Sequence, residues 1–238
     1  MKKYISVFQM IARSSLYKVC LILIGMVIAE GSMLYLTITN PSGFNFEEYI
    51  DQSQYSLAFQ IAYILVTIVI VLPGMNLGSN QSYTLQRLRI KERKIYWLQS
   101  LYNMLAYVLL WGVQMIMVFV SIVIYQKNIP IEATLSNQTM FLAFYRNNFM
   151  HSIFPLEDIP GASLIVIIGI TTAFVAAEFT KLQRQGKFGF ELLILIAAVI
   201  ISFPRELGQD LAFPLISMAF VYFVLSVRFF LNMEVKEE

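Results

Sequence analysis

Six long apolar runs divide the chain, and they constrain its fold more than any other feature. They cover about residues 19–36, 57–77, 96–125, 162–177, 188–203 and 211–231. A helix needs about 20 mostly apolar residues to cross a hydrocarbon core about 30 Å thick. The runs lack the alternation of polar and apolar residues that marks the strands of an outer-membrane barrel. We therefore expect an all-α membrane protein with six transmembrane helices, built as a single domain over residues 1–238.

The composition supports this expectation. Hydrophobic residues make up 58% of the chain and charged residues only 13%, whereas a soluble domain has about 45–50% apolar and about 25% charged residues. The first run could belong to a cleaved signal peptide, but its apolar part continues past Glu30 to Leu36, and no small-residue cleavage motif follows it. We therefore expect it to be retained as the first transmembrane helix.

Lysine and arginine predict the orientation. If the N-terminus lies in the cytoplasm, the cytoplasmic segments contain 14 of the 17 basic residues, and only Lys127, Arg146 and Arg205 lie outside. Basic residues gather in the cytoplasmic loops of membrane proteins. The sequence therefore predicts that both termini are cytoplasmic.

Two segments outside the apolar runs have the spacing of amphipathic helices. In residues 1–15, polar and apolar side chains recur on different faces, which predicts an interfacial helix in the headgroup plane; the alternative is an extension of the first transmembrane helix. In about residues 138–155, Leu142, Tyr145, Phe149 and Ile153 recur at helical spacing. This pattern predicts an outer amphipathic segment that packs on the outer membrane face or caps the transmembrane helices.

The segment of about residues 82–92, between the second and third runs, combines charge with large apolar side chains. Five basic residues lie within residues 87–94. A basic segment that only sets the orientation of the chain in the membrane does not need apolar residues among its charges. Exposed apolar residues at a cytoplasmic surface are typical of a docking site. We therefore predict a short cytoplasmic helix that docks on a partner, with the candidate residues Tyr83, Leu85, Arg87, Leu88, Arg89, Ile90 and Glu92.

The sequence contains no recognisable catalytic or metal-binding constellation. Its only cysteine is Cys20 and its only histidine is His151, so clusters of cysteine or histidine ligands are excluded. The phosphate-binding pattern G-x-x-x-x-G-K-[ST] is absent, as are H-E-x-x-H and G-x-S-x-G. We expect no catalytic residue, no metal site and no cofactor bound by this chain, and we expect His151 to be a polar residue at the outer interface.

Ionisable residues inside transmembrane segments are the first candidates for function in a membrane protein. Glu30 lies toward the outer half of the first run and has no obvious basic partner on its own helix. It is therefore a candidate for lining a water-filled cavity; alternatively, it reaches the outer headgroups. No series of buried acids recurs through the other runs, which argues against a proton-coupled transporter.

These features together resemble the membrane subunit of a type II ABC exporter. The likeness lies in the order of an amphipathic N-terminal helix, six transmembrane helices with both ends inside, and a Tyr/Leu/Arg segment between the second and third. Ser82-Tyr-Thr-Leu-Gln-Arg-Leu-Arg-Ile-Lys-Glu92 is similar to the coupling helix of these permeases, and residues 144–147 and 155–158 are similar to outer loops of small bacterial members. Many members have two re-entrant helices between the fifth and sixth transmembrane helices, whereas here only about residues 204–210 intervene.

The resemblance implies that the chain is half of a transporter in a bacterial plasma membrane. It would pair with a second copy or a related permease. It would also dock on an ABC ATPase subunit, present twice per transporter, which binds the ATP and Mg²⁺ that drive export. By position, Leu85 and Leu88 would contact the ATPase, with Tyr83, Arg87 and Arg89 beside them. No nucleic-acid partner is expected.

The apolar runs constrain the cargo only broadly. A cavity lined by aliphatic and aromatic side chains suits an amphipathic cargo, and the resemblance favours a toxic or antimicrobial peptide, with drugs and lipids as alternatives. A membrane carrier or channel that works without ATP is the alternative function. It would need polar residues along the transmembrane helices, where few are present.

Overall fold

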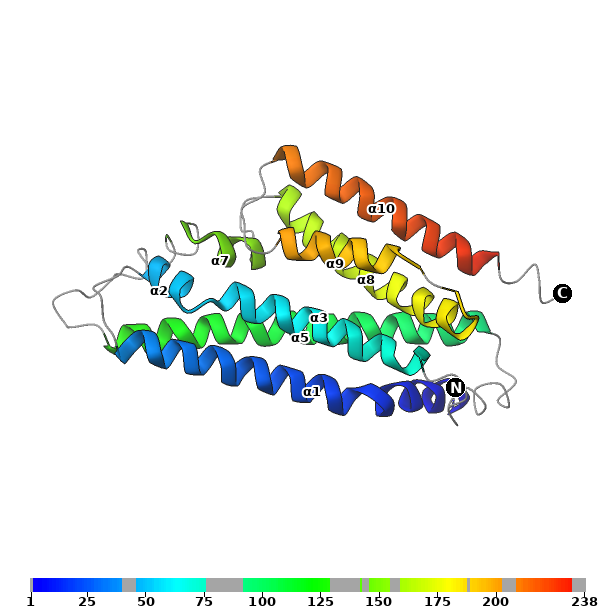
Figure 1. Cartoon of the computed structure of the whole chain (residues 1–238), viewed down its shortest axis with the longest axis horizontal. Coiled ribbons are helices and arrows are strands. Elements are labelled where there is room, and N and C mark those ends of the chain that lie inside the picture. Colours follow the sequence, from blue (N-terminus) through cyan, green and yellow to red (C-terminus); the bar gives the residue numbers. More distant parts are fainter. Residues whose placement is uncertain are drawn as a thin grey trace.

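The computed structural model describes residues 2–39, 46–75, 92–128, 142, 146–154, 159–187, 189–202 and 209–232. Over these residues the chain forms helices and no strand (Figure 1). In chain order the helices are α1 (Lys2–Thr39), α2 (Phe46–Gln52), α3 (Tyr55–Met75), α5 (Glu92–Asn128), α7 (Asn148–Ile153), α8 (Ile159–Arg184), α9 (Glu191–Ser202) and α10 (Gln209–Leu231). The predicted all-helical fold is confirmed for this part of the chain.

Five of these helices, α1, α3, α5, α8 and α10, are long and apolar enough to cross a membrane. Their outward faces carry exposed aliphatic side chains such as Leu21 and Ile24 on α1 and Leu105 and Leu109 on α5. Such continuous apolar surfaces are typical of helices in contact with lipid or a partner rather than water. The chain is therefore a multi-pass membrane protein.

The predicted fifth transmembrane helix is shorter than expected. The run at 188–203 forms α9, which has 12 residues and is about 18 Å long at about 1.5 Å per residue. The hydrocarbon core is about 30 Å thick, so the described helix does not cross it alone. The count of six transmembrane helices remains a prediction.

Residues 2–15 and the first apolar run form one helix, α1. Its N-terminal turns pack on the beginning of α5, where Val7 and Ile11 join Ile95 in a buried apolar cluster. Ser15 Oγ donates a hydrogen bond of 2.9 Å to Tyr102 Oη in the same region. The beginning of α1 is thus attached to another helix, and its predicted position in the headgroup plane stays a prediction.

α8 is the central helix of the bundle. It packs against α3, α5, α9 and α10, while α1 packs against α3 and α5 on the other side. All residues from Thr171 to Ala177 are buried, and most of them are small. Small residues let the backbones of membrane helices approach closely, and accordingly Thr171 Oγ1 donates to the Ala219 carbonyl of α10 at 3.3 Å.

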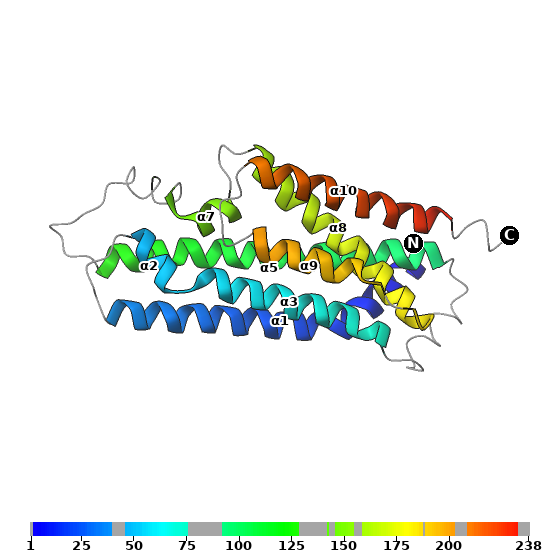
Figure 2. The same cartoon turned by 45° about the horizontal axis from the view of Figure 1, so that its top comes forward.

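One end of the bundle gathers the beginnings of α1, α5 and α9 and the ends of α3, α8 and α10 (Figures 1 and 2). Lys94 Nζ donates to Tyr4 Oη at 2.6 Å, and the ring of Tyr96 stacks on that of Phe230. Described lysines and arginines at or near these helix ends include Arg93, Lys94, Lys181, Lys187 and Arg228, and we call it the basic end. The long helices run in alternating directions along the bundle, so the beginning of α1 and the end of α10 lie at the same end of it, on opposite sides (Figure 1).

The opposite end is closed by α2 and α7. Asn147 caps α7, because its Oδ1 accepts hydrogen bonds from the backbone amides of Phe149 and Met150 at 3.1 and 3.0 Å. Its Nδ2 donates to Asp51 Oδ1 of α2 at 2.9 Å. One asparagine therefore fixes the start of α7 and joins it to α2.

Tyr49 of α2 packs in an aromatic group with Phe46 and Tyr125, with ring centroids 5.1 Å apart for the two tyrosines. Burial, together with the neighbouring Tyr125, raises the pKa of Tyr49 to about 12. The phenol is therefore neutral at physiological pH, which suits its apolar surroundings.

α7 corresponds to part of the predicted outer amphipathic segment. Phe149 and Ile153 are buried, as their spacing predicted, whereas Leu142 is half exposed. Tyr145 lies outside the described residues. His151 was expected at the outer interface, and its side chain is buried within the bundle together with Phe149, Met150 and Ile153.

Candidate functional site

The predicted docking residues Tyr83, Leu85, Arg87, Leu88, Arg89 and Ile90 lie outside the described residues. Glu92 is described and is the first residue of α5. Its Oε2 forms an ion pair of 2.6 Å with Lys181 Nζ near the end of α8. The far end of the candidate docking segment is thus tied to α8 at the basic end.

Lys181 also lies over the ring of Phe229 in α10, 5.9 Å from its centroid. Through this lysine, the beginning of α5 contacts the ends of both α8 and α10.

Glu30 belongs to a group of buried polar side chains between α1, α3 and α5. Glu30 and Gln114 are fully buried, and Tyr55 is 1% exposed. The Glu30 carboxyl lies near the Gln114 amide and near Tyr55. Gln114 is the hydrogen-bonding neighbour of the Glu30 carboxyl, although no polar atom of either side chain makes a hydrogen bond of good geometry to a described residue.

The Glu30 side chain faces the bundle interior, and it is not among the residues that line the cavity described below. Its predicted role in lining a water-filled cavity stays a prediction. A buried carboxyl with only neutral polar neighbours carries a large desolvation cost. Residues of this kind inside a membrane bundle are retained mainly where they have a function.

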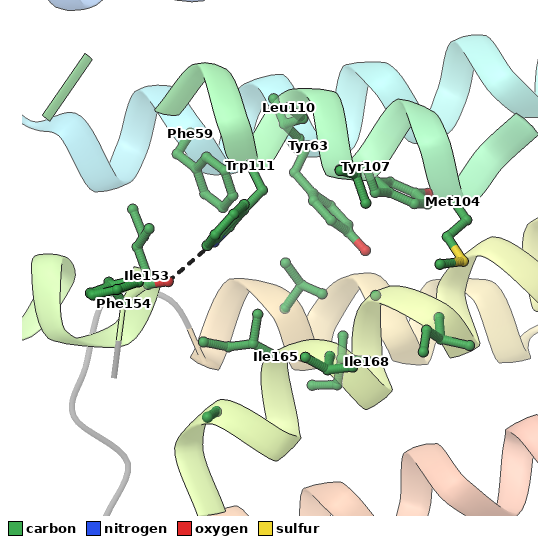
Figure 3. A pocket seen from close by; sticks show the side chains of 16 residues that line it. Phe59, Tyr63, Met104, Tyr107, Leu110, Trp111, Ile153, Phe154, Ile165 and Ile168 are labelled. Carbon is green, nitrogen blue, oxygen red and sulfur yellow. Dashed lines mark hydrogen bonds between the residues drawn. The ribbon is translucent and has the colours of Figure 1, made fainter. Parts of the chain in front are cut away.

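A cavity of about 430 Å³ lies between α3, α5, α7, α8 and α9 (Figure 3). Its lining is almost entirely aliphatic and aromatic: Phe59, Tyr63, Met104, Tyr107, Val108, Leu110, Trp111, Ile153, Phe154, Ala162, Ile165, Val166, Ile168, Gly169, Ile170 and Val199. Met104, Val108 and Val166 are 38%, 54% and 59% exposed. The cavity therefore opens to the outside of the bundle between α5 and α8.

The cavity exists because α5 and α8 are held together at one end and separate toward the other (Figures 1 and 3). Near the basic end, Tyr96 Oη donates to the Phe174 carbonyl at 2.8 Å, and Asn103 Nδ2 donates to the Ala173 carbonyl at 3.1 Å. Beyond this crossing the helices diverge toward α7. There Trp111 Nε1 donates to the Ile153 carbonyl at 3.1 Å, so α7 closes the wide end.

Two stacked tyrosines form one wall of the cavity. The rings of Tyr63 and Tyr107 are nearly parallel, with centroids 4.9 Å apart. Tyr107 Oη shares a hydrogen bond of 2.9 Å with Thr67 Oγ1. Tyr63 Oη is buried near the hydroxyls of Tyr107 and of Thr172 on α8, and Figure 3 shows the Tyr63 side chain extending toward α8.

Sequence reasoning did not find this cavity. Its lining residues come from five helices and carry no motif, and an aromatic or aliphatic residue in a membrane helix is usually ordinary packing. The buried position of Gln114 was also missed, although a glutamine in the middle of an apolar run was a usable signal. Within the described segments, no group of three or more histidine, cysteine, aspartate or glutamate side chains could hold a metal ion.

Comparisons of the chain with protein-family models, with curated proteins and with solved structures found no match.

Proposed function

We propose that this chain is the membrane subunit of an ATP-driven ABC exporter, forming half of the translocation path and docking on a separate ATPase subunit. The observation that carries the proposal is the Tyr/Leu/Arg segment of residues 82–92 and its position in the chain. The segment connects α3 to α5, and both helices meet it at the basic end.

The contacts of α5 support a coupling role for this segment. α5 starts at Glu92, has 37 residues, and packs against α1, α3 and α8. Its first turns bond to α1 through Lys94 and to α8 through Glu92. A movement of the docking segment would therefore be transmitted along α5 to the cavity wall and to the group of Glu30, Gln114 and Tyr55.

The test is capture of the ATPase. We predict that a protein with the G-x-x-x-x-G-K-[ST] motif co-purifies with the tagged chain when native membranes are solubilised in mild detergent. We also predict that Leu88→Asp lowers the recovery of this ATPase at least about tenfold. The reason is that a charge replaces an apolar anchor, and loss of such an anchor costs about 2 kcal/mol or more. Recovery is measured by mass spectrometry, normalised to the permease.

The matched control is Ile159→Asp, the same change at an exposed residue that begins α8 at the opposite end. It should leave ATPase recovery unchanged. If Leu88→Asp inserts normally and retains the ATPase as well as the parent does, the docking assignment is wrong.

The proposed cargo is an amphipathic peptide of the toxic or antimicrobial class, with drugs and lipids as alternatives. What supports an amphipathic cargo is the apolar character of the helices that would line the path between two permease copies.

One observation favours the second candidate, an ATP-independent carrier. A carrier needs polar groups within the membrane, and the group of Glu30, Gln114 and Tyr55 supplies them. Transport by the purified chain alone in vesicles, lost in Glu30→Gln, would favour this function over the exporter.

A further inference from the structure

In the described part of the chain, the Glu30 carboxyl has no charged neighbour. On its own helix, the buried residues one turn away on either side are Met26 and Leu34, and both are apolar. α5 presents Gln114 to the carboxyl and α3 presents Tyr55, and both side chains are uncharged. Apolar and neutral polar groups therefore enclose this acid.

The other titratable groups around the carboxyl are phenols. Tyr55 is beside it, and Tyr49 of α2 is in turn close to Tyr55. Ser121 of α5 is in hydrogen-bonding reach of Tyr55, donates to the Val118 carbonyl at 2.6 Å and does not titrate. Phenols have an ordinary pKa of about 10, so none of these groups carries a charge at neutral pH.

An ionised carboxylate is unfavourable at this position. The transfer of an isolated carboxylate from water into an apolar interior costs so much that buried acids take up a proton instead. An opposite charge would offset this cost, but the described neighbours supply none. Water does not solvate the carboxyl either, because Glu30 and Gln114 have no exposed surface.

The protonated acid also suits Gln114 better than the carboxylate does. A carboxylate only accepts hydrogen bonds, whereas the protonated acid has an O–H donor and a carbonyl acceptor. The amide of Gln114 has an acceptor oxygen and N–H donors, so the acid and the amide can form a pair with two hydrogen bonds. A carboxylate could not donate to the amide oxygen.

The lack of free space limits what else could bind there. With no exposed surface on Glu30 or Gln114, neither side chain has room beside it for a water molecule or a hydrated ion. A proton adds to the carboxyl without needing additional space. It is therefore the one ligand that fits the site in this arrangement of the helices.

We propose that Glu30 is a proton-binding site that is loaded in this arrangement of α1, α3 and α5, with its O–H donated to the amide oxygen of Gln114. When the helices part and water reaches the carboxyl, the O–H bond breaks and the proton passes to a water molecule. A single carboxyl does not form a path across the membrane, so the site couples helix packing to pH and does not itself transport protons. This inference does not depend on the proposed exporter function, and its tests use the purified full chain without an ATPase.

Infrared spectroscopy detects the bound proton directly. The C=O stretch of a protonated carboxylic acid absorbs above the amide I band, whereas a carboxylate absorbs below it. We predict that the difference spectrum of parent minus Glu30→Gln, recorded at neutral pH, contains the band of a protonated acid. Glu191→Gln, at an exposed acid, is the matched control, and its difference spectrum should contain carboxylate bands only. Loss of carboxylate bands in Glu30→Gln as well would overturn the proposal.

Gln114→Leu identifies the band by a second route, should Glu30→Gln not fold. This variant keeps the acid and removes its amide neighbour. The C=O stretch of the acid should move to higher frequency, because its carbonyl loses a hydrogen-bond donor. An unshifted acid band in the folded variant would overturn the pairing of Glu30 with Gln114.

The pH dependence of stability tests the release of the proton. The folded chain keeps the proton on Glu30, whereas the carboxyl of the unfolded chain has an ordinary pKa of about 4.3 and loses its proton to water. The stability of the parent should therefore fall as the pH rises. Relative to Glu30→Gln, the ratio of folded to unfolded parent should drop about tenfold from about pH 5 to about pH 6.

The measurement is unfolding by titration with a denaturing detergent in mixed micelles at each pH. The other titratable groups are the same in both proteins, so their contributions cancel in the comparison. A purely structural role of Glu30 would give a stability difference that does not change with pH. Such a constant difference, or one that changes in the opposite direction, would overturn the proposal.

Discussion

At the scale of single residues, Glu30 is the most unusual group in the described bundle. Its carboxyl is fully buried between α1, α3 and α5, and its neighbour Gln114 is buried with unused hydrogen-bonding capacity. A core selected only for stability would place apolar side chains at both positions, because unpaired buried polar groups are destabilising. Polar residues inside a membrane bundle are often functional, so we expect this pair to have a role that offsets its cost in stability.

Glu30→Gln tests this cost. We predict that it stabilises the protein by about 1–3 kcal/mol, because it removes an ionisable group and allows an amide pair with Gln114. The measurement is thermal unfolding in detergent. Glu191→Gln, at an exposed acid, is the control and should change stability by less than about 1 kcal/mol. A lower melting temperature for Glu30→Gln would show that the carboxyl stabilises the fold.

The sequence predicted where Glu30 lies along the first helix, but it did not predict which residues surround the Glu30 side chain. Gln114 and Tyr55 lie on other helices, and no local pattern connects them to Glu30. The sequence likewise placed Glu92 in a docking segment without predicting its ion pair to Lys181, which depends on how α5 and α8 cross.

At the scale of elements, the apolar runs predicted which segments are helical but not their lengths or angles. α1 begins at Lys2 because no helix-breaking residue separates residues 2–15 from the apolar run. α3 continues through Pro73 to Met75, although proline disfavours the interior of a helix. The angle between α5 and α8 creates the cavity, and it depends on Asn103 and the small residues of α8. Hydrophobic periodicity in the sequence does not predict this angle.

The link between α2 and α7 makes a prediction with a defined pH dependence. Asn147→Asp keeps the oxygen that caps α7 but replaces the donor to Asp51 with a second carboxylate. The like charges should destabilise α7 at neutral pH by about 1–2 kcal/mol. In this variant, the two carboxyl groups raise each other's pKa in the folded state. The loss of α7 stability should therefore be present at pH values above the usual carboxyl pKa, and it should disappear as the pH falls below about 4.

Hydrogen exchange of the Phe149 and Met150 amides is the measurement, because both donate to Asn147. Asn147→Ala removes the side chain that caps α7, so the Phe149 and Met150 amides should exchange faster than in the parent at every pH. If Asn147→Asp and the parent exchange alike at neutral pH, the bond between Asn147 and Asp51 does not hold α7 in place.

At the scale of the whole molecule, the bundle has two chemically different ends. The basic end combines the chain beginning, the end of α10 and the positions where residues 76–91 leave and rejoin the helices (Figures 1 and 2). α2 and α7 close the other end. This polarity was predictable from the distribution of lysine and arginine, because charge distribution is a property of the chain and does not depend on packing.

The exporter account requires the basic end to face the cytoplasm, where an ATPase can reach residues 82–92. The most direct measurement is labelling of single cysteines by a membrane-impermeant maleimide, with Cys20→Ser as the background. The account predicts that Ile159→Cys is labelled in intact cells, whereas Leu88→Cys is labelled only after the membrane is opened in denaturant. Labelling of Leu88→Cys from outside intact cells would contradict the account.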